Sequence, residues 1–195
     1  MATVAINNSP IHDDSTLTAV YGDTGSMWSC GFHTGVDFVP YGTTVAQPDI
    51  YSVCDGTVVE VHASPSGALG CYVVVEDLNG DYWRYCHMVD GSIQVNLNDN
   101  VTTASIIGQM GATGNVTGIH LHLEYATTAY WSCSTFMNPC DYLQIPNERG
   151  TVVEYDGTIP PTPPTPPTPI RRGKFPWVLY AKKLRAKHIL DKMSR

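Results

Sequence analysis

Alternation of hydrophobic and polar residues between residues 28 and 146 predicts β-strands rather than helices. Residues 119–126 alternate strictly, which is typical of a strand with one buried face. Three further segments are rich in β-branched and aromatic residues and are bounded by glycine or Asn-Gly: residues 57–63, 71–78 and 82–88. Because no long helical periodicity precedes residue 170, we predict a mainly β domain of antiparallel sheets with loops over one face.

The segment Leu78-Asn79-Gly80-Asp81 predicts a tight hairpin between the last two of these strands. Two-residue hairpin turns need positive φ, which both Asn and Gly tolerate. We therefore expect positive φ at both Asn79 and Gly80.

A PPT repeat marks the C-terminal boundary of this domain. Proline fixes φ and removes a hydrogen-bond donor, so the repeat predicts an extended polyproline II spacer. The basic segment beyond it is expected to be helical from about Pro176, because proline is favoured in the first turn. The predicted organisation is an N-terminal extension packed on or flanking the domain (1–27), the domain (28–146), a trailing segment (147–158), the linker (159–170) and the basic tail (171–195).

The net charge of −7 is unevenly distributed along the chain. Residues 1–169 hold two basic and seventeen acidic residues (−15), and residues 170–195 hold nine basic residues and one acid (+8), which together give −7. Since the domain has little to neutralise phosphates, nucleic acid is excluded as its partner. The tail could hold the protein on an anionic wall polymer or membrane surface, or be a solvated extension.

The first 26 residues lack the basic segment and apolar run of a secretory signal, so we expect no signal peptide. No stretch of about eighteen apolar residues suggests a transmembrane helix. Six cysteines are present, and none forms the C-x-x-C pair of a zinc ribbon. Cys133 and Cys140 are close enough for a small disulfide loop, whereas the alternative is six buried thiols packed as small hydrophobes.

Four histidines and one aspartate form the candidate chemistry. His33 and Asp37 lie four residues apart in GFHTGVDF, where glycine and proline disfavour a helix, so both side chains point to one side of an extended segment. His87 ends a predicted strand, and His120 and His122 project from one face of another. A catalytic zinc takes three such ligands and leaves one position for water, and further histidines can move protons or stabilise an oxyanion.

In order, the chain reads HTGVDFVPYGTTV, CDGTVVEV, YCHM, GQMGATGNVTGIHLHLEY and MNPCDYL. Over residues 28–143 this resembles the lysostaphin/LytM-type zinc endopeptidases, which cut peptidoglycan peptides. The resemblance implies antiparallel sheets bearing a narrow groove walled by loops, the duplicated hybrid motif fold of lysostaphin-type peptidases. It also implies one zinc ion per chain, with metal ligands His33, Asp37 and His122 and a catalytic pair, His87 and His120.

In the expected reaction, His120 takes a proton from a zinc-bound water, and zinc and His87 stabilise the oxyanion. Glu124 shares the face of His122 and could orient it. The glycines of residues 111–118 should let the backbone approach the groove closely. The bond cut, in a cross-bridge or a stem peptide, is left open by the sequence.

The lack of a signal, the single catalytic domain, the linker and the basic module resemble a bacteriophage endolysin. We expect a monomer, made in the host cytoplasm, that acts at the bacterial cell wall after release or is carried on the virion. The alternatives are a virion structural protein with a wall-cutting domain, a non-catalytic wall-binding or regulatory module, or a thiol peptidase. In the last case Cys30, Cys54 or Cys71 would pair with His87 or His120.

Overall fold

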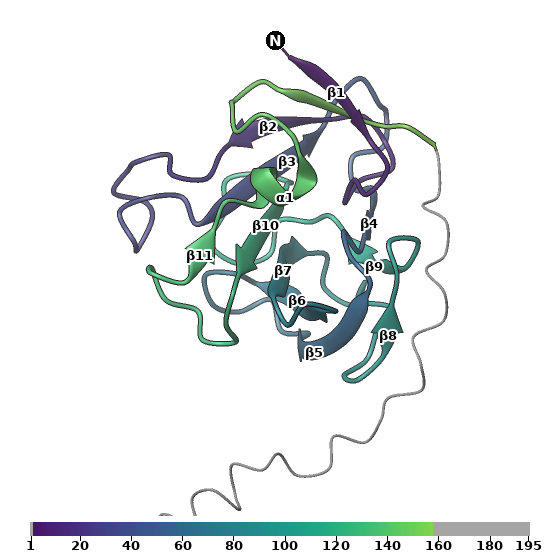
Figure 1. Cartoon of the computed structure of the whole chain (residues 1–195), viewed down its shortest axis with the longest axis vertical. Helices are drawn as coiled ribbons and strands as arrows, with labels where there is room; N and C mark the ends of the chain where they lie inside the picture. Colours follow the sequence, from purple (N-terminus) through teal and green to yellow (C-terminus); the bar gives the residue numbers. More distant parts are fainter. Residues whose placement is uncertain (1, 158–195) are drawn as a thin grey trace, which may run out of the picture. The chain divides into compact units, whose positions relative to one another are not determined.

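The computed structural model of the chain describes residues 2–157 (Figure 1). The PPT spacer (159–170) and the helical tail (171–195) expected from the sequence lie outside these residues. Within the described part, no helix has the length and apolar character needed to cross a bilayer.

Twelve strands and one short helix make up residues 2–157, so the mainly β prediction is confirmed. A ten-stranded sheet has the order β1-β12-β2-β3-β10-β7-β6-β5-β8, with β11 also paired to β10, and β4 and β9 form a second sheet. The bounds are β1 Thr3–Ile6, β2 Ser15–Ala19, β3 Gly35–Pro40, β4 Asp49–Tyr51, β5 Gly56–His62, β6 Cys71–Asp77, β7 Tyr82–Met88, β8 Asn100–Val101, β9 Ile106–Gln109, β10 Leu121–Ala126, β11 Phe136–Met137, α1 Pro139–Leu143 and β12 Val152–Tyr155.

The hairpin between β6 and β7 forms as expected, but its turn differs from the prediction. Gly80 has φ +90, whereas Asn79 is not among the residues with positive φ. Instead, Oδ1 of Asp77 accepts hydrogen bonds from the backbone N–H groups of Asn79 (2.8 Å) and Asp81 (3.0 Å). The prediction of positive φ at both turn residues is wrong because the Asp77 side chain organises a longer turn.

The sheet is not wholly antiparallel, because β1 and β12 pair in parallel, with Thr3 opposite Val152. This pair lies outside residues 28–146, within which the strands pair antiparallel as predicted. A parallel pair needs a long crossover, and here almost the whole domain lies between the two strands. Since β12 also pairs with β2, the segments on both sides of residues 28–146 extend the same sheet.

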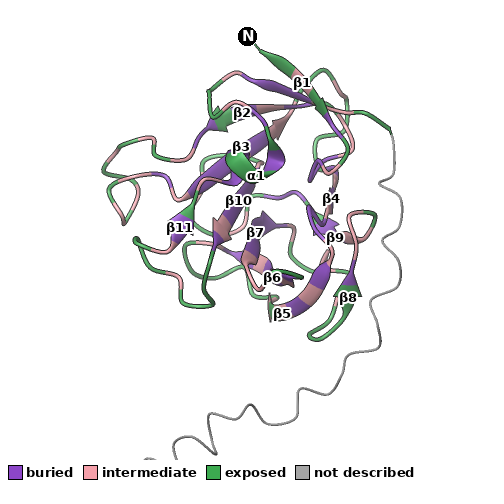
Figure 2. Cartoon of the chain, in the orientation of Figure 1, coloured by how far each residue is buried: buried purple, intermediate pink, exposed green. Residues whose placement is uncertain are grey.

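Strands β3, β10 and β7 form the centre of the sheet, and Figure 2 shows them largely buried. Leu121 and Leu123 of β10 pack in the hydrophobic core with Phe38 of β3 and are fully inaccessible to solvent. Because side chains alternate along a strand, His122 and Glu124 are left on the opposite face. The core therefore fixes which face of the sheet carries the candidate chemistry.

A disulfide joins Cys30 to Cys133, with their Cα atoms 5.5 Å apart. Both the predicted Cys133–Cys140 loop and the alternative of six buried thiols are therefore wrong, since Cys140 is a free, buried thiol in α1. The reason is tertiary: the loop before β3 and the loop after β10 meet, although they are 103 residues apart. The disulfide thus ties together two loops that flank the candidate site.

Candidate metal centre

Strands β3 and β10 bring the first two candidate ligands together. Asp37 lies opposite His122 in the antiparallel register, and residues opposite one another project from the same face. Nδ1 of His122 is 2.8 Å from Oδ1 of Asp37. Gly35 lets the strands approach so closely, because a Cβ atom there would lie 2.2 Å from the carbonyl oxygen of Leu123.

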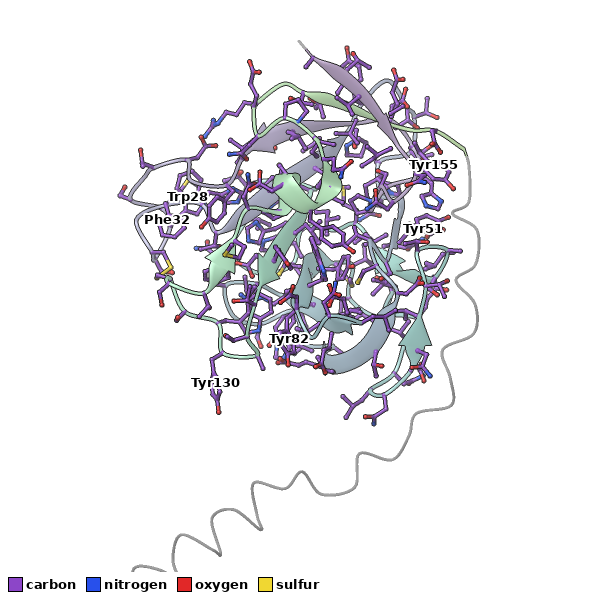
Figure 3. The ribbon with its side chains drawn as sticks, in the orientation of Figure 1. Trp28, Phe32, Tyr51, Tyr82, Tyr130 and Tyr155 are labelled. Atoms are coloured by element: carbon purple, nitrogen blue, oxygen red, sulfur yellow. A yellow bond between two sulfur atoms is a disulfide. The ribbon has the colours of Figure 1, made fainter. Side chains whose placement is uncertain are left out.

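His33 lies just before β3 and completes the cluster. Its Nδ1–H donates to the carbonyl oxygen of Val20 (3.2 Å), which leaves the lone pair on Nε2. Nε2 lies 3.1 Å from Oδ1 of Asp37 and 3.0 Å from Nδ1 of His122. The ring of Trp28, on the loop that leads into β3 (Figure 3), lies 5.1 Å from the His33 ring.

The three donor atoms fit a zinc ion. The Nε2–H of His122 donates to Oε1 of Glu124 (3.1 Å), so loss of the Nδ1 proton leaves a lone pair directed toward the other two donors. In a tetrahedral site with zinc–ligand bonds of about 2.0–2.1 Å, donor atoms are about 3.3 Å apart. The separations between the three donors here, 2.8–3.1 Å, need to widen only slightly.

The charges around these residues also favour a cation. Burial opposes the ionised form of Asp37, but the contacts with His122 and His33 hold its pKa well below its usual range. Burial likewise opposes a charge on His122, but Glu124 and Asp37 raise its pKa to about 10. Metal-free His122 is therefore protonated at neutral pH between two carboxylates, and a bound cation would replace its Nδ1 proton.

His120 lies beside this cluster, at the entry to β10. Its Nδ1–H donates to the carbonyl oxygen of Gly118 (2.9 Å), and its Nε2 lies 3.8 Å from Oδ1 of Asp37. His120 also forms an isolated β-bridge with Gly111. Gly111 itself packs closely on the chain after β7, because a Cβ atom there would lie 2.5 Å from the backbone nitrogen of Val89. Neutral His120 thus presents an Nε2 lone pair to the centre, as a general base requires.

His87 reaches the same place through an irregularity in β7. Cys71 pairs with Met88 and Val73 with Tyr85, so β7 contains one extra residue, a β-bulge. His87 has φ +63, and its ring centroid lies 4.8 Å from that of His120. Regular alternation would point His87 away from the His122 face, because its neighbour Cys86 lies opposite His122. The bulge therefore turns His87 toward the site.

The positive φ of His87 predicts how substitutions there change the stability of the fold. Positive φ costs a residue with a Cβ atom about 1–2 kcal/mol, whereas glycine adopts it freely. His87→Gly should therefore be more stable than His87→Ala by about 1 kcal/mol in denaturant unfolding. At Glu76 of β6, which lacks positive φ, the same two substitutions should give the opposite order. If His87→Ala is at least as stable as His87→Gly, the positive φ at position 87 does not strain the backbone.

Residues 31–132 match the family model described as Peptidase family M23, a span of just over half the chain. The chain belongs to peptidase family M23. The resemblance stated from the motifs is thereby confirmed. All five predicted site residues lie inside the matched span.

Relatives of the M23 domain include wall-active proteins. It is 40% identical over 93 residues to peptidoglycan DD-endopeptidase ShyA of Vibrio cholerae serotype O1, covering 47% of this chain and 20% of that protein. It is 33% identical over 97 residues to Endolysin 2638A of Staphylococcus phage 2638A, covering 48% and 19%. The catalytic domain of lysostaphin from Staphylococcus simulans superposes with TM-score 0.56 and 27% identity, covering 67% of this chain and 92% of that domain. The chain spans about a fifth of the length of these curated relatives.

Two features of the M23 domain are not indicated by the motifs. Arg84, on β7, donates from Nε to Oε2 of Glu124 (2.6 Å), and its guanidinium lies 3.9 Å from the ring centroid of Trp131. The second feature is the Cys30–Cys133 disulfide. The composition could have drawn attention to Arg84, because it is one of only two basic residues among the first 169.

Proposed function

We propose that the chain is a zinc-dependent endopeptidase that hydrolyses peptide bonds in bacterial peptidoglycan. The observation that carries this proposal is the convergence of three lone-pair donors, from His33, Asp37 and His122, beside two imidazoles with free Nε2 atoms. Similarity to ShyA and lysostaphin supports a peptide of the cell wall as substrate.

His33, Asp37 and His122 would hold the zinc ion. When bound, zinc supplies Lewis acidity and brings the pKa of a coordinated water toward about 7. The orientations of two of these ligands are fixed, because Val20 accepts from His33 and Glu124 accepts from His122. Zinc binding would then need only the release of the Nδ1 proton of His122.

His120 would act as the general base. Gly118 fixes the proton on Nδ1, so Nε2 can take a proton from the water that attacks the carbonyl carbon. As the C–N bond breaks, the same nitrogen gives this proton to the leaving amine, and each turnover returns His120 to its starting state.

His87 would stabilise the oxyanion, but only when protonated. Its Nδ1–H donates to the carbonyl oxygen of Thr113 (2.9 Å), so neutral His87 has no proton on Nε2. Burial and the neighbouring His122 lower the pKa of His87 to about 4. We therefore propose that His87 takes a proton from solvent as negative charge develops on the substrate oxygen, and returns it to solvent when that charge is lost as the C–N bond breaks.

A thiol peptidase has little support. Cys30 is disulfide-bonded, Cys54 and Cys71 are buried, and burial raises the pKa of both thiols, that of Cys54 to about 12. A catalytic thiol needs a lowered pKa. A non-catalytic module is also disfavoured, since all five site positions keep residues that can bind metal or move protons.

For the biological setting, we propose a phage endolysin that acts as a monomer at the cell wall. Similarity to Endolysin 2638A supports this role, although a virion-associated enzyme would use the same chemistry. Binding of the basic tail (171–195) to an anionic wall polymer or membrane surface remains a prediction from charge.

Digestion of purified peptidoglycan tests the proposal. We expect the chain to release fragments with new amino termini from peptidoglycan with either glycine cross-bridges or direct cross-links, and mass spectrometry of the fragments to identify the bond cut. A chelator should stop the release and added zinc restore it, while iodoacetamide should have no effect. Absence of new amino termini from both substrates, or release that persists in the chelator, would refute the proposal.

A further inference from the structure

A buried ion pair next to the metal centre has no part in the proposed reaction. Arg84 of β7 lies opposite Glu124 of β10, and both residues are buried. Nε of Arg84 donates to Oε2 of Glu124 at 2.6 Å, and Nη2 contacts the same oxygen. Nε and Nη2 of the guanidinium therefore contact the same oxygen of the carboxylate.

The other oxygen of Glu124 faces the centre. Oε1 accepts from the hydroxyl of Thr34 (2.5 Å) and from Nε2–H of His122 (3.1 Å). With donors on both oxygens, the carboxylate cannot rotate without breaking hydrogen bonds on each side. Arg84 thus fixes the group that orients His122.

Trp131 covers this pair. Its ring centroid lies 3.9 Å from the guanidinium carbon of Arg84, close enough for a cation–π interaction. Two residues along the chain, Cys133 is bonded to Cys30, which comes three residues before His33. The loop that covers the ion pair is therefore tied to the segment that carries a metal ligand.

We propose that Arg84 is a positioning residue for the metal centre. Acting through Glu124, it fixes the ring orientation and tautomer of His122 and so raises the affinity for zinc; this inference rests on the proposed function. Partners that hold a ligating histidine typically change metal affinity 10- to 100-fold when they are removed. Arg84 itself touches neither substrate nor metal in this scheme.

A purely structural role predicts different behaviour. Buried ion pairs can often be replaced by neutral residues without loss of stability, whereas removal of one partner leaves the other charge unpaired. If Arg84 only compensates the charge of Glu124, Arg84→Lys, which keeps that charge, should have wild-type stability and zinc affinity. If Arg84 positions Glu124 through its guanidinium donors, Arg84→Lys should keep the stability but bind zinc more weakly.

The experiment compares Arg84→Lys, Arg84→Met and Glu124→Gln with wild type in the full chain. The readouts are the zinc dissociation constant, by competition with a chelating dye, and the thermal midpoint of the metal-free protein. Arg149→Met is the matched control, because Arg149 also donates from Nε to a carboxylate, that of Asp23 (2.7 Å), but is largely exposed.

We expect wild type and Arg149→Met to bind one zinc ion with equal affinity. Arg84→Lys should have a thermal midpoint near that of wild type but a zinc affinity about 10-fold weaker, and Glu124→Gln should bind zinc at least as weakly. Because no charge is left unpaired in Arg84→Lys, this variant decides the question even where Arg84→Met does not fold. Wild-type zinc affinity in Arg84→Lys would overturn the role of Arg84 alone, whereas absence of zinc binding in wild type would overturn the proposed function as well.

Discussion

Replacing Asp37 with alanine is expected to abolish both zinc binding and peptidoglycan hydrolysis while leaving the fold intact. Oδ1 of Asp37 lies within 3.1 Å of both other donor atoms, so its loss removes the one carboxylate of the three proposed ligands. Loss of zinc removes several kcal/mol of transition-state stabilisation, a decrease in rate on the order of 1,000-fold or more. His33→Ala should give the same result.

The measurement pairs zinc content, by metal analysis of the purified protein, with the rate of fragment release and the circular dichroism spectrum. Asp14→Ala is a matched control, because Asp14 is an exposed aspartate and its loss should change none of the three. The outcome that counts against the assignment is an Asp37→Ala variant that is folded, free of zinc and still able to cleave the wall.

Local patterns were sufficient for much of this centre. The strict alternation around His120 and His122 placed both imidazoles on one face, and the core positions of Leu121 and Leu123 explain why. The predicted strand at 119–126 begins only at Leu121, because residue 120 makes an isolated bridge to Gly111. Glu124, expected to orient His122 from its position two residues along, does contact it.

Three features of the site could not be predicted from local sequence patterns, because each depends on two segments that are far apart in the chain. The extra residue in β7 that turns His87 toward the site leaves no mark in YWRYCHM, because a bulge is defined by its partner strand. The Cys30–Cys133 bond joins two loops that are distant in sequence and lie next to the paired strands β3 and β10. Arg84 could have been singled out by its charge, yet its partner follows only from the β7–β10 register.

His120→Ala should separate catalysis from metal binding. Nε2 of His120 lies 3.8 Å from Asp37, farther than either proposed ligand nitrogen, and His120 makes no hydrogen bond that orients a ligand. We therefore expect one zinc ion per chain with wild-type affinity in this variant. Turnover should fall by about 100- to 10,000-fold, the usual contribution of a general base.

The test measures zinc stoichiometry by titration calorimetry and steady-state kinetics on a soluble peptide released from the wall. A general base that acts on the water contributes to the chemical step, so kcat should fall while KM changes little. His62→Ala is the control, since His62 stacks on Tyr72 at the surface of β5 and should leave both quantities unchanged. If His120→Ala loses zinc instead, His120 belongs to the ligand set; if it keeps both zinc and turnover, His87 is the remaining candidate for the base, because its Nε2 also carries a lone pair.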